Sequence, residues 1–177
     1  MKSVKFIHIL LSALIISFPA IAQTGTANAP DTLAPYQKTP YIPSFSVQMP
    51  DSSWFSKNGL QPNRPTLIFY FSPDCGHCQN ETERLLSKIK EFNNLQIVMI
   101  TSRPFADMTN FAKYFKINRF PQIKIGTDPA RYVTRFYDVK FTPFSALYNE
   151  KGTLVKVYEK EIDMKELISL VNNKEKS

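Results

Sequence analysis

Cysteine and histidine are scarce in this chain of 177 residues, and their scarcity excludes two kinds of site. The cysteines are Cys75 and Cys78, and the histidines are His8 and His77. A structural zinc site commonly takes four ligands in two pairs, whereas this chain supplies a single cysteine pair. Covalent haem attachment needs a histidine directly after the second cysteine, where this sequence has Gln79. We therefore expect neither a metal nor a covalent haem here.

Basic residues are not clustered, which argues against another class of function. Twenty-two Lys and Arg against 15 Asp and Glu give a formal charge of +7. They form no Lys- and Arg-rich block with aromatic residues between them, so the sequence does not predict nucleic-acid binding. The modest positive charge favours acidic partners or surfaces only in a general way. There is also no internal repeat.

The sequence has no long apolar run of the kind that spans a membrane. The mostly apolar run at 6–18 is short against the roughly 20 residues that a spanning helix needs. Lys2 and Lys5 precede it, and the small-x-small motif at 20–22 follows it, as in a secretory signal. We predict a signal peptide at 1–22 and a periplasmic or extracellular location. The alternative is that 6–18 is retained as a membrane anchor.

Export changes how the cysteine pair is interpreted. In an oxidising compartment two cysteines would often form a structural disulfide. Cys75 and Cys78 are only three residues apart, and closing so short a loop removes little entropy from the unfolded chain. The pair would stabilise the fold poorly, so we interpret it as a redox-active pair instead.

The spacing of apolar residues and prolines predicts the domain organisation. Residues 23–41 carry several prolines and few charges, which predicts an extended tether. The folded domain is predicted at 42–172, and residues 173–177 form a polar tail. Continuous apolar runs predict buried strands, and periodic apolar residues predict helices. The expected strands are 45–49, 66–71, 95–101, 122–125, 144–148 and 153–158, and the expected helices begin near Cys75, Pro104, Ala130 and Asp163. This order predicts an α/β fold with a mixed sheet between helices.

The first cysteine is predicted to lie between a buried strand and the start of a helix. The unpaired N–H groups and the dipole of that helix end favour a thiolate at Cys75. Cys78, one turn on, can then attack a mixed disulfide formed at Cys75. Gly76 permits close approach, and a protonated His77 would further favour the thiolate, whereas the carboxylate of Asp74 would raise the pKa of the thiol. The simpler interpretation of Asp74 is a helix N-cap.

Three segments together resemble a known family. They are "PSFSVQMPDSSWF", "FSPDCGHCQNE" and "FTPFSALYNEKGTLVKVY". The chain resembles the thioredoxin-fold superfamily over roughly 42–172, and within it the exported TlpA-like, or redoxin, thiol-disulfide oxidoreductases. The resemblance implies a cis peptide bond at Pro143, with Thr142 and Pro143 contacting substrate. It also implies a client protein and a redox partner protein, with no dissociable cofactor.

Glu81 matches a glutamate that some relatives in cytochrome maturation place three residues after the second cysteine. A carboxylate one turn from Cys78 could exchange a proton with the resolving thiol. The alternative is an ordinary solvated glutamate. The chain departs from thioredoxin itself at Phe69, where thioredoxin has a buried aspartate, and at Asp74, where it has tryptophan. These departures leave the direction of electron flow open.

Two other functions remain open from the sequence. A thiol peroxidase would have a Ser or Thr three residues before its reactive cysteine, and Ser72 is there, but Ile68 replaces the proline usual upstream. A non-catalytic binding module would keep the fold and use the disulfide only for stability.

Overall fold

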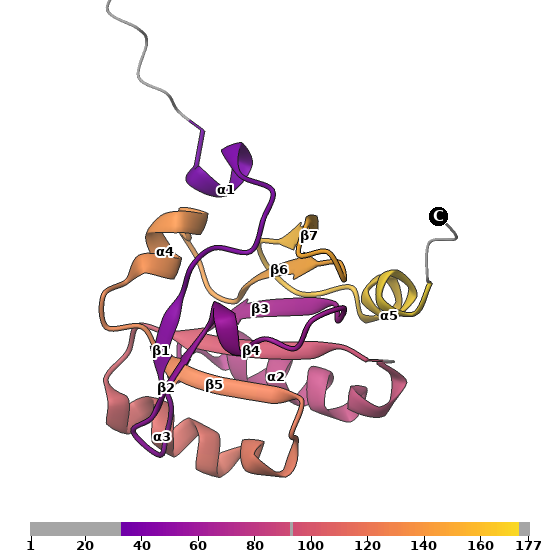
Figure 1. Ribbon diagram of the computed structural model, residues 1–177. Helices are drawn as coiled ribbons and strands as arrows, with labels where there is room; N and C mark the ends of the chain where they lie inside the picture. The colour runs from indigo at the N-terminus through magenta and orange to yellow at the C-terminus, as the bar shows by residue number, and fades with distance from the viewer. Residues whose placement is uncertain (1–32, 93, 174–177) are drawn as a thin grey trace, which may run out of the picture. The chain divides into compact units, whose positions relative to one another are not determined.

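The computed structural model describes residues 33–92 and 94–173 of the chain (Figure 1). The predicted signal peptide, the first part of the predicted tether and most of the predicted tail lie outside these residues. The membrane anchor considered at 6–18 lies outside them too. Among the helices in the described part of the chain, none is both long enough and apolar enough to cross a membrane.

A mixed sheet forms the centre of the described structure. Its strands lie in the order β2-β1-β5-β4-β3-β6-β7. Their bounds are β1 (Ser46–Gln48), β2 (Trp54–Ser56), β3 (Thr66–Tyr70), β4 (Gln96–Thr101), β5 (Ile123–Thr127), β6 (Phe144–Tyr148) and β7 (Leu154–Tyr158). The three central strands β3, β4 and β5 run parallel, and β6 pairs with β3 in the antiparallel direction. The predicted mixed sheet is therefore confirmed.

Strands β3 and β4 are mostly apolar and buried throughout because helices cover both faces of the sheet. In β3, Leu67 and Phe69 point into one core, and Ile68 and Tyr70 point into the other. All five residues of β3 are buried. Alternate side chains of a strand face opposite sides, so a strand buried on both sides has no polar face.

The helices are divided between the two faces by the direction of the crossovers. The helices are α1 (Pro35–Lys38), α2 (Gly76–Ser87), α3 (Phe105–Tyr114), α4 (Tyr132–Tyr137) and α5 (Met164–Asn172), with 3₁₀ turns η1 (Lys57–Gly59), η2 (Ile89–Glu91) and η3 (Ile117–Arg119). The steps from β3 to β4 and from β4 to β5 run the same way across the sheet. Right-handed crossovers therefore place α2 and α3 on one face, where α5 joins them. The step from β5 back to β6 places α4 on the other face with α1 (Figure 1).

Two local expectations need correction. The extended tether was predicted to run through residue 41, but Pro35–Lys38 forms the short helix α1. The ring of Tyr36 lies 5.8 Å from that of Tyr137, so α1 packs on the domain. No strand was expected between 45–49 and 66–71, but Trp54–Ser56 forms β2, the edge strand beside β1. In contrast, α5 begins next to Asp163 as predicted, and Asp163 caps it by accepting hydrogen bonds from two backbone N–H groups of its first turn.

Candidate functional site

The cysteine pair lies where the chain passes from β3 into α2. Cys75 is the N-cap residue of α2, and Cys78 lies within its first turn. Cys75 is half-buried, whereas Cys78 is fully buried, and both are free thiols. Among residues 33–92 and 94–173, no three His, Cys, Asp or Glu side chains are grouped as a metal-ligand set. The predicted strand-cysteine-helix arrangement is present.

A proline loop distant in sequence faces the first cysteine. The Thr142–Pro143 peptide bond is cis, as predicted. The thiol of Cys75 donates to the carbonyl oxygen of Thr142 across 3.6 Å. The sheet brings them together, because β6 begins directly after Pro143 and pairs with β3, which ends just before the cysteine loop. Pro143 itself is buried, and Thr142 is half-buried.

The two thiols have opposite pKa shifts. Partial burial raises the pKa of Cys75, but hydrogen bonding from Cys78 and from the backbone N–H of His77 outweighs it, so the pKa lies below its usual value. Burial raises the pKa of Cys78 to about 12, and a hydrogen bond from the backbone N–H of Ser72 at 3.5 Å opposes this only in part. At neutral pH the thiolate therefore forms more readily at Cys75, the cysteine that is accessible.

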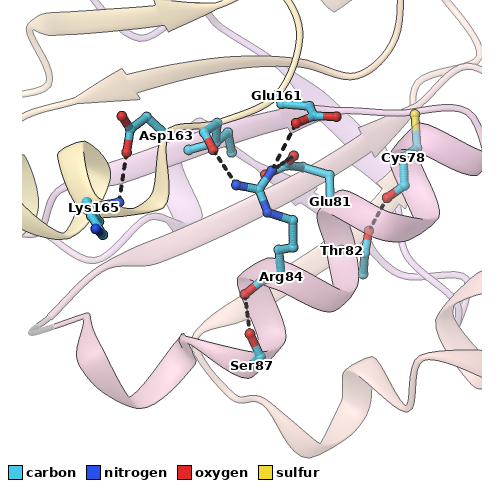
Figure 2. Close-up of polar contacts among 9 residues, drawn as sticks. Cys78, Glu81, Thr82, Arg84, Ser87, Glu161, Asp163 and Lys165 are labelled. Atoms are coloured by element: carbon cyan, nitrogen blue, oxygen red, sulfur yellow. Dashed lines mark hydrogen bonds and ion pairs between the residues drawn. The ribbon is translucent and has the colours of Figure 1, made fainter.

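Glu81 lies one turn beyond Cys78 on the buried side of α2. Its side chain is 0% exposed, so the alternative of a solvated glutamate is wrong. Arg84 donates from Nη1 to Glu81 Oε2 at 2.8 Å and from Nη2 to the carbonyl oxygen of Ile162 at 2.9 Å. Figure 2 shows the guanidinium group of Arg84 between Glu81 and Glu161, with Cys78 further along the same helix.

The protonation of Glu81 is set by opposing effects. Burial raises the pKa of the carboxyl group, the positive charge of Arg84 and the backbone N–H of Ile162 lower it, and the negative charge of Glu161 raises it again. The net shift is upward. Oxygen Oε1 has no hydrogen-bond partner in the described part of the chain. This carboxylate thus has one oxygen held by Arg84 and the other available to accept a proton.

No protein-family model matches this chain, and no curated protein matches its sequence. Solved structures do match it. A thiol-disulfide oxidoreductase from Bacteroides fragilis is 16% identical, with a TM-score of 0.60, over 73% of this chain and 98% of that one. A secreted Mycobacterium tuberculosis disulfide oxidoreductase, homologous to E. coli DsbE, is 18% identical, with a TM-score of 0.57, over 72% and 93%. A peroxiredoxin-like protein from Aquifex aeolicus is 14% identical, with a TM-score of 0.61, over 74% and 83%.

The chain has a thioredoxin-like fold. The expected resemblance is confirmed at the level of the fold, because the matching structures include thioredoxin-fold thiol-disulfide oxidoreductases. A peroxiredoxin-like protein matches equally well, so the thioredoxin-like fold alone does not separate the two chemistries. Disulfide exchange and peroxide reduction must therefore be distinguished by the residues at the site.

Asp74 does not have the role expected of it in this thioredoxin-like fold. It was expected to cap α2, but the N-cap position belongs to Cys75. Asp74 instead accepts a hydrogen bond from the hydroxyl of Ser72 and one from Arg103 Nη2 at 3.0 Å. The hydrogen bond from Ser72 is the main reason that the pKa of Asp74 is lowered, and Arg103 contributes less. Arg103 also offsets the negative charge that Asp74 places beside Cys75.

The two residues between the cysteines are open to solvent. The side chain of His77 is exposed, and a side chain built at Gly76 would meet nothing within 4 Å. The space needed for a second protein to approach the pair is therefore present. The expected effect of the His77 side chain on the thiolate stays a prediction.

A groove of about 970 Å³ lies beside the proline loop. It runs along the ends of the parallel strands, where the thioredoxin-like fold leaves loops rather than helices. Thr142 lines it, so the groove begins at the residue that contacts Cys75. Phe141, 79% exposed, lies at its edge. Tyr70, Ser102, Arg103, Arg131 and Lys140 also line the groove.

Sequence reasoning missed three residues of this region. Arg84 is three residues after Glu81, a spacing that places both on one face of a helix, and this was the available signal. Phe141 directly precedes the Thr-Pro pair, and an aromatic residue at that place was a second signal. Arg103 gave no signal, because its contact with Asp74 depends on β4 ending where α2 begins, at the same edge of the sheet.

Proposed function

We propose that this protein is an exported thiol-disulfide oxidoreductase that exchanges disulfides with protein clients. The observation that carries the proposal is the pairing of an accessible Cys75, whose pKa is lowered, with the cis-proline loop 3.6 Å away. A lowered thiol pKa at a helix start is the condition for a reactive cysteine. The matching solved structures described as disulfide oxidoreductases support the same chemistry.

The proposed reaction has two exchanges. The Cys75 thiolate attacks one sulfur of a client disulfide, forming a mixed disulfide and releasing the other client sulfur as a thiolate, which takes a proton from water. The Cys78 thiol then loses its proton and attacks Cys75. A Cys75–Cys78 disulfide forms, and the bond to the client breaks. The client gains two electrons, and the protein loses two. In reverse, the oxidised protein oxidises a client dithiol.

Cys78 needs a base for the second exchange, and Glu81 is the group proposed for it. A thiol with a pKa of about 12 ionises rarely at neutral pH without assistance. Glu81 lies one turn away on the same buried side of α2, and its Oε1 has no hydrogen-bond partner within the described residues. We assign Glu81 the acceptance of the Cys78 proton and its later return.

The groove beside Thr142 is the proposed binding place for the client. An extended client segment there would place its cysteine against Cys75. Phe141 offers apolar contact, and the adjacent Pro143 fixes the direction of the loop that carries Thr142. The electrons come from a second protein, so no dissociable cofactor is required. The predicted signal at 1–22 supports an extracytoplasmic location.

The peroxidase alternative gains little from the site. Its Ser72 hydroxyl would be expected to contact the reactive cysteine, but it donates to Asp74 instead. Peroxide consumption by a Cys78→Ser variant, measured in the presence of an external thiol, decides the question. Rapid consumption would favour the peroxidase and count against the proposal.

The proposal is tested with a short peptide that contains one disulfide and a fluorophore quenched until reduction. The reduced protein should open this peptide in a stoichiometric reaction, and Cys75→Ser should reduce the rate to that of buffer. If Cys75→Ser opens the peptide as fast as the parent protein, the redox function is lost and the non-catalytic module is favoured. The reduction potential then gives the direction: about −270 mV indicates a reductant, and about −120 to −180 mV indicates an oxidase or isomerase.

A further inference from the structure

Arg84 is the side chain that holds the buried carboxylate of Glu81 in place. Its guanidinium group makes two hydrogen bonds, one to Glu81 Oε2 and one to the carbonyl oxygen of Ile162. The first joins residues of the same helix, and the second ties α2 to the segment between β7 and α5 (Figure 2). The planar fork of arginine can make both contacts at once with fixed geometry, which a lysine cannot do.

The hydrogen bond from Arg84 fixes the orientation of the Glu81 carboxylate. Because Oε2 is bound to Arg84, the carboxylate cannot rotate freely, and Oε1 is the oxygen without a hydrogen-bond partner in the described part of the chain. Cys78 and Glu81 are three residues apart on α2, so they lie on the same face of the helix. Both are fully buried. The fixed carboxylate and the resolving thiol thus lie on the same buried face of α2.

The charges that face Glu81 come from two elements. Arg84 faces it from α2, and Glu161 and the backbone at Ile162 face it from the segment between β7 and α5. Arg84 is the cation in contact with it, at 2.8 Å. Glu161 Oε2 is 3.6 Å from Arg84 Nη1 and 60% exposed, so solvent screens its influence. Among the charged groups around Glu81, Arg84 thus has the strongest influence on its ionisation, and it opposes the effect of burial.

We propose that Arg84 is a positioning residue for the second exchange, holding Glu81 ionised and oriented so that it accepts the proton of Cys78. This inference rests on the proposed role of Glu81. Arg84 itself contacts neither sulfur in the structure, and it acts through the carboxylate. Without Arg84, Glu81 would bind its proton more tightly, and less of the base would be available at neutral pH.

Dithiodipyridine, an uncharged aromatic disulfide, separates the two exchanges. Reduced protein attacks it through Cys75, releasing one coloured thiopyridone and leaving the other on Cys75. Cys78 then attacks Cys75 and releases the second thiopyridone. Two phases of colour appear, and only the second depends on the Cys78 proton. Stopped-flow measurements across a range of pH therefore report Cys75 and Cys78 separately.

The variants are Arg84→Met, which keeps the aliphatic stem without the charge, and Arg84→Lys, which keeps the charge without the fork. Arg84→Met should leave the first phase unchanged and slow the second about tenfold, less than the roughly 100-fold expected when Glu81→Gln removes the base. In the pH profile of the second-phase rate, the rise at low pH should move to higher pH. Arg84→Lys should recover most of the rate. Lys88→Met is the matched control, since Lys88 lies at the end of the same helix and pairs with Glu91.

A double variant separates positioning from a merely structural role. If Arg84 acts through Glu81, Glu81→Gln with Arg84→Met is no slower in the second phase than Glu81→Gln alone. The inference is wrong if the double variant loses rate in the second phase by the product of the two single losses. It is also wrong if Arg84→Met leaves the rate and the pH profile of the second phase unchanged. If the parent protein itself shows no second phase, the proposed function fails instead, so the two failures are distinguishable.

Discussion

The exposed start of α2 and its buried side shift the pKa of a cysteine thiol in opposite directions. At the exposed start, Cys75 is half-buried, and helix N–H groups favour its thiolate. One turn on, Cys78 is fully buried, and its pKa rises to about 12. Three residues of a helix therefore separate a reactive thiol from a protected one.

The same contrast appears in the charged pairs on the two sides. Arg103 and Asp74 meet at 3.0 Å with 49% and 65% of their side chains exposed. Arg84 and Glu81 meet at 2.8 Å with 34% and 0% exposed. Exposed pairs contribute little because solvent and salt screen them, whereas breaking a pair with a buried member leaves an uncompensated charge. The buried pair should thus influence chemistry far more than the exposed one.

The largest effect is expected where the buried thiol is removed. Cys78→Ser or Cys78→Ala should abolish turnover with the disulfide peptide, because the mixed disulfide at Cys75 has no internal nucleophile to resolve it. Mass spectrometry of the intact protein should show a stable adduct of protein and peptide. Comparing serine with alanine controls for polarity at a buried position. Turnover near the parent rate in either variant would contradict the assigned roles.

The two thiols should also differ in how alkylation depends on pH. Thiolates are the reacting form, so the rate at each cysteine rises through its own pKa. With iodoacetamide and peptide mapping of the reduced protein, Cys75 should reach half its maximal rate at a lower pH than an ordinary cysteine thiol does. Cys78 should remain protected until the pH approaches about 12. If both rates rise together near the usual value, the contrast between the two sides of α2 is lost.

Glu81 gives a smaller effect, visible in stability. Its pKa is raised in the folded protein, so its contribution to stability is complete below the unfolded pKa of about 4.3 and is lost as the pH rises through the folded value. Glutamine does not ionise, so Glu81→Gln removes this loss of stability at higher pH. The free energy of unfolding in urea, measured at a series of pH values, should therefore fall less for Glu81→Gln than for the parent protein above about pH 4.3.

Glu83→Gln is the matched control for that experiment, because Glu83 lies exposed on the same helix. It should keep the pH dependence of the parent protein. An identical slope for the parent protein and Glu81→Gln would show that the carboxyl group of Glu81 titrates alike in the folded and unfolded chains. Its assigned burial effect would then be wrong.

Local patterns in the sequence predicted most of the exposed side of α2. A buried strand run and two cysteines at helix spacing are short-range signals, whereas the position of the Thr142–Pro143 pair was implied by the family resemblance. The structure places all three together as expected. The N-cap was predicted wrongly, because Asp74 and Cys75 are adjacent and either residue type can precede a helix. The cap was decided by Arg103 and Ser72, which draw the Asp74 side chain away from the helix.

The buried side was less predictable, because burial depends on contacts between distant segments. Glu81 looks like an ordinary helix glutamate until the segment after β7 closes over it. Its spacing from Arg84 was readable from the sequence, but the hydrogen bond from Arg84 to the carbonyl oxygen of Ile162 joins residues 78 positions apart. Helix α1 escaped prediction for a similar reason: its four residues are helical where Tyr36 packs against Tyr137.

The smallest expected effect belongs to the exposed pair, and it is the closest counterpart of the Arg84 experiment. Arg103→Met leaves the Asp74 charge beside Cys75 without its partner, so the pKa of the Cys75 thiol should rise slightly. The first phase with uncharged dithiodipyridine should slow by about twofold or less, the range expected for an exposed pair. Added salt should shrink the difference, since both side chains are open to solvent. A slowing as large as the one Arg84→Met causes in the second phase would show that exposure does not distinguish the two pairs, and that Arg103 contributes to Cys75 chemistry by more than screened charge.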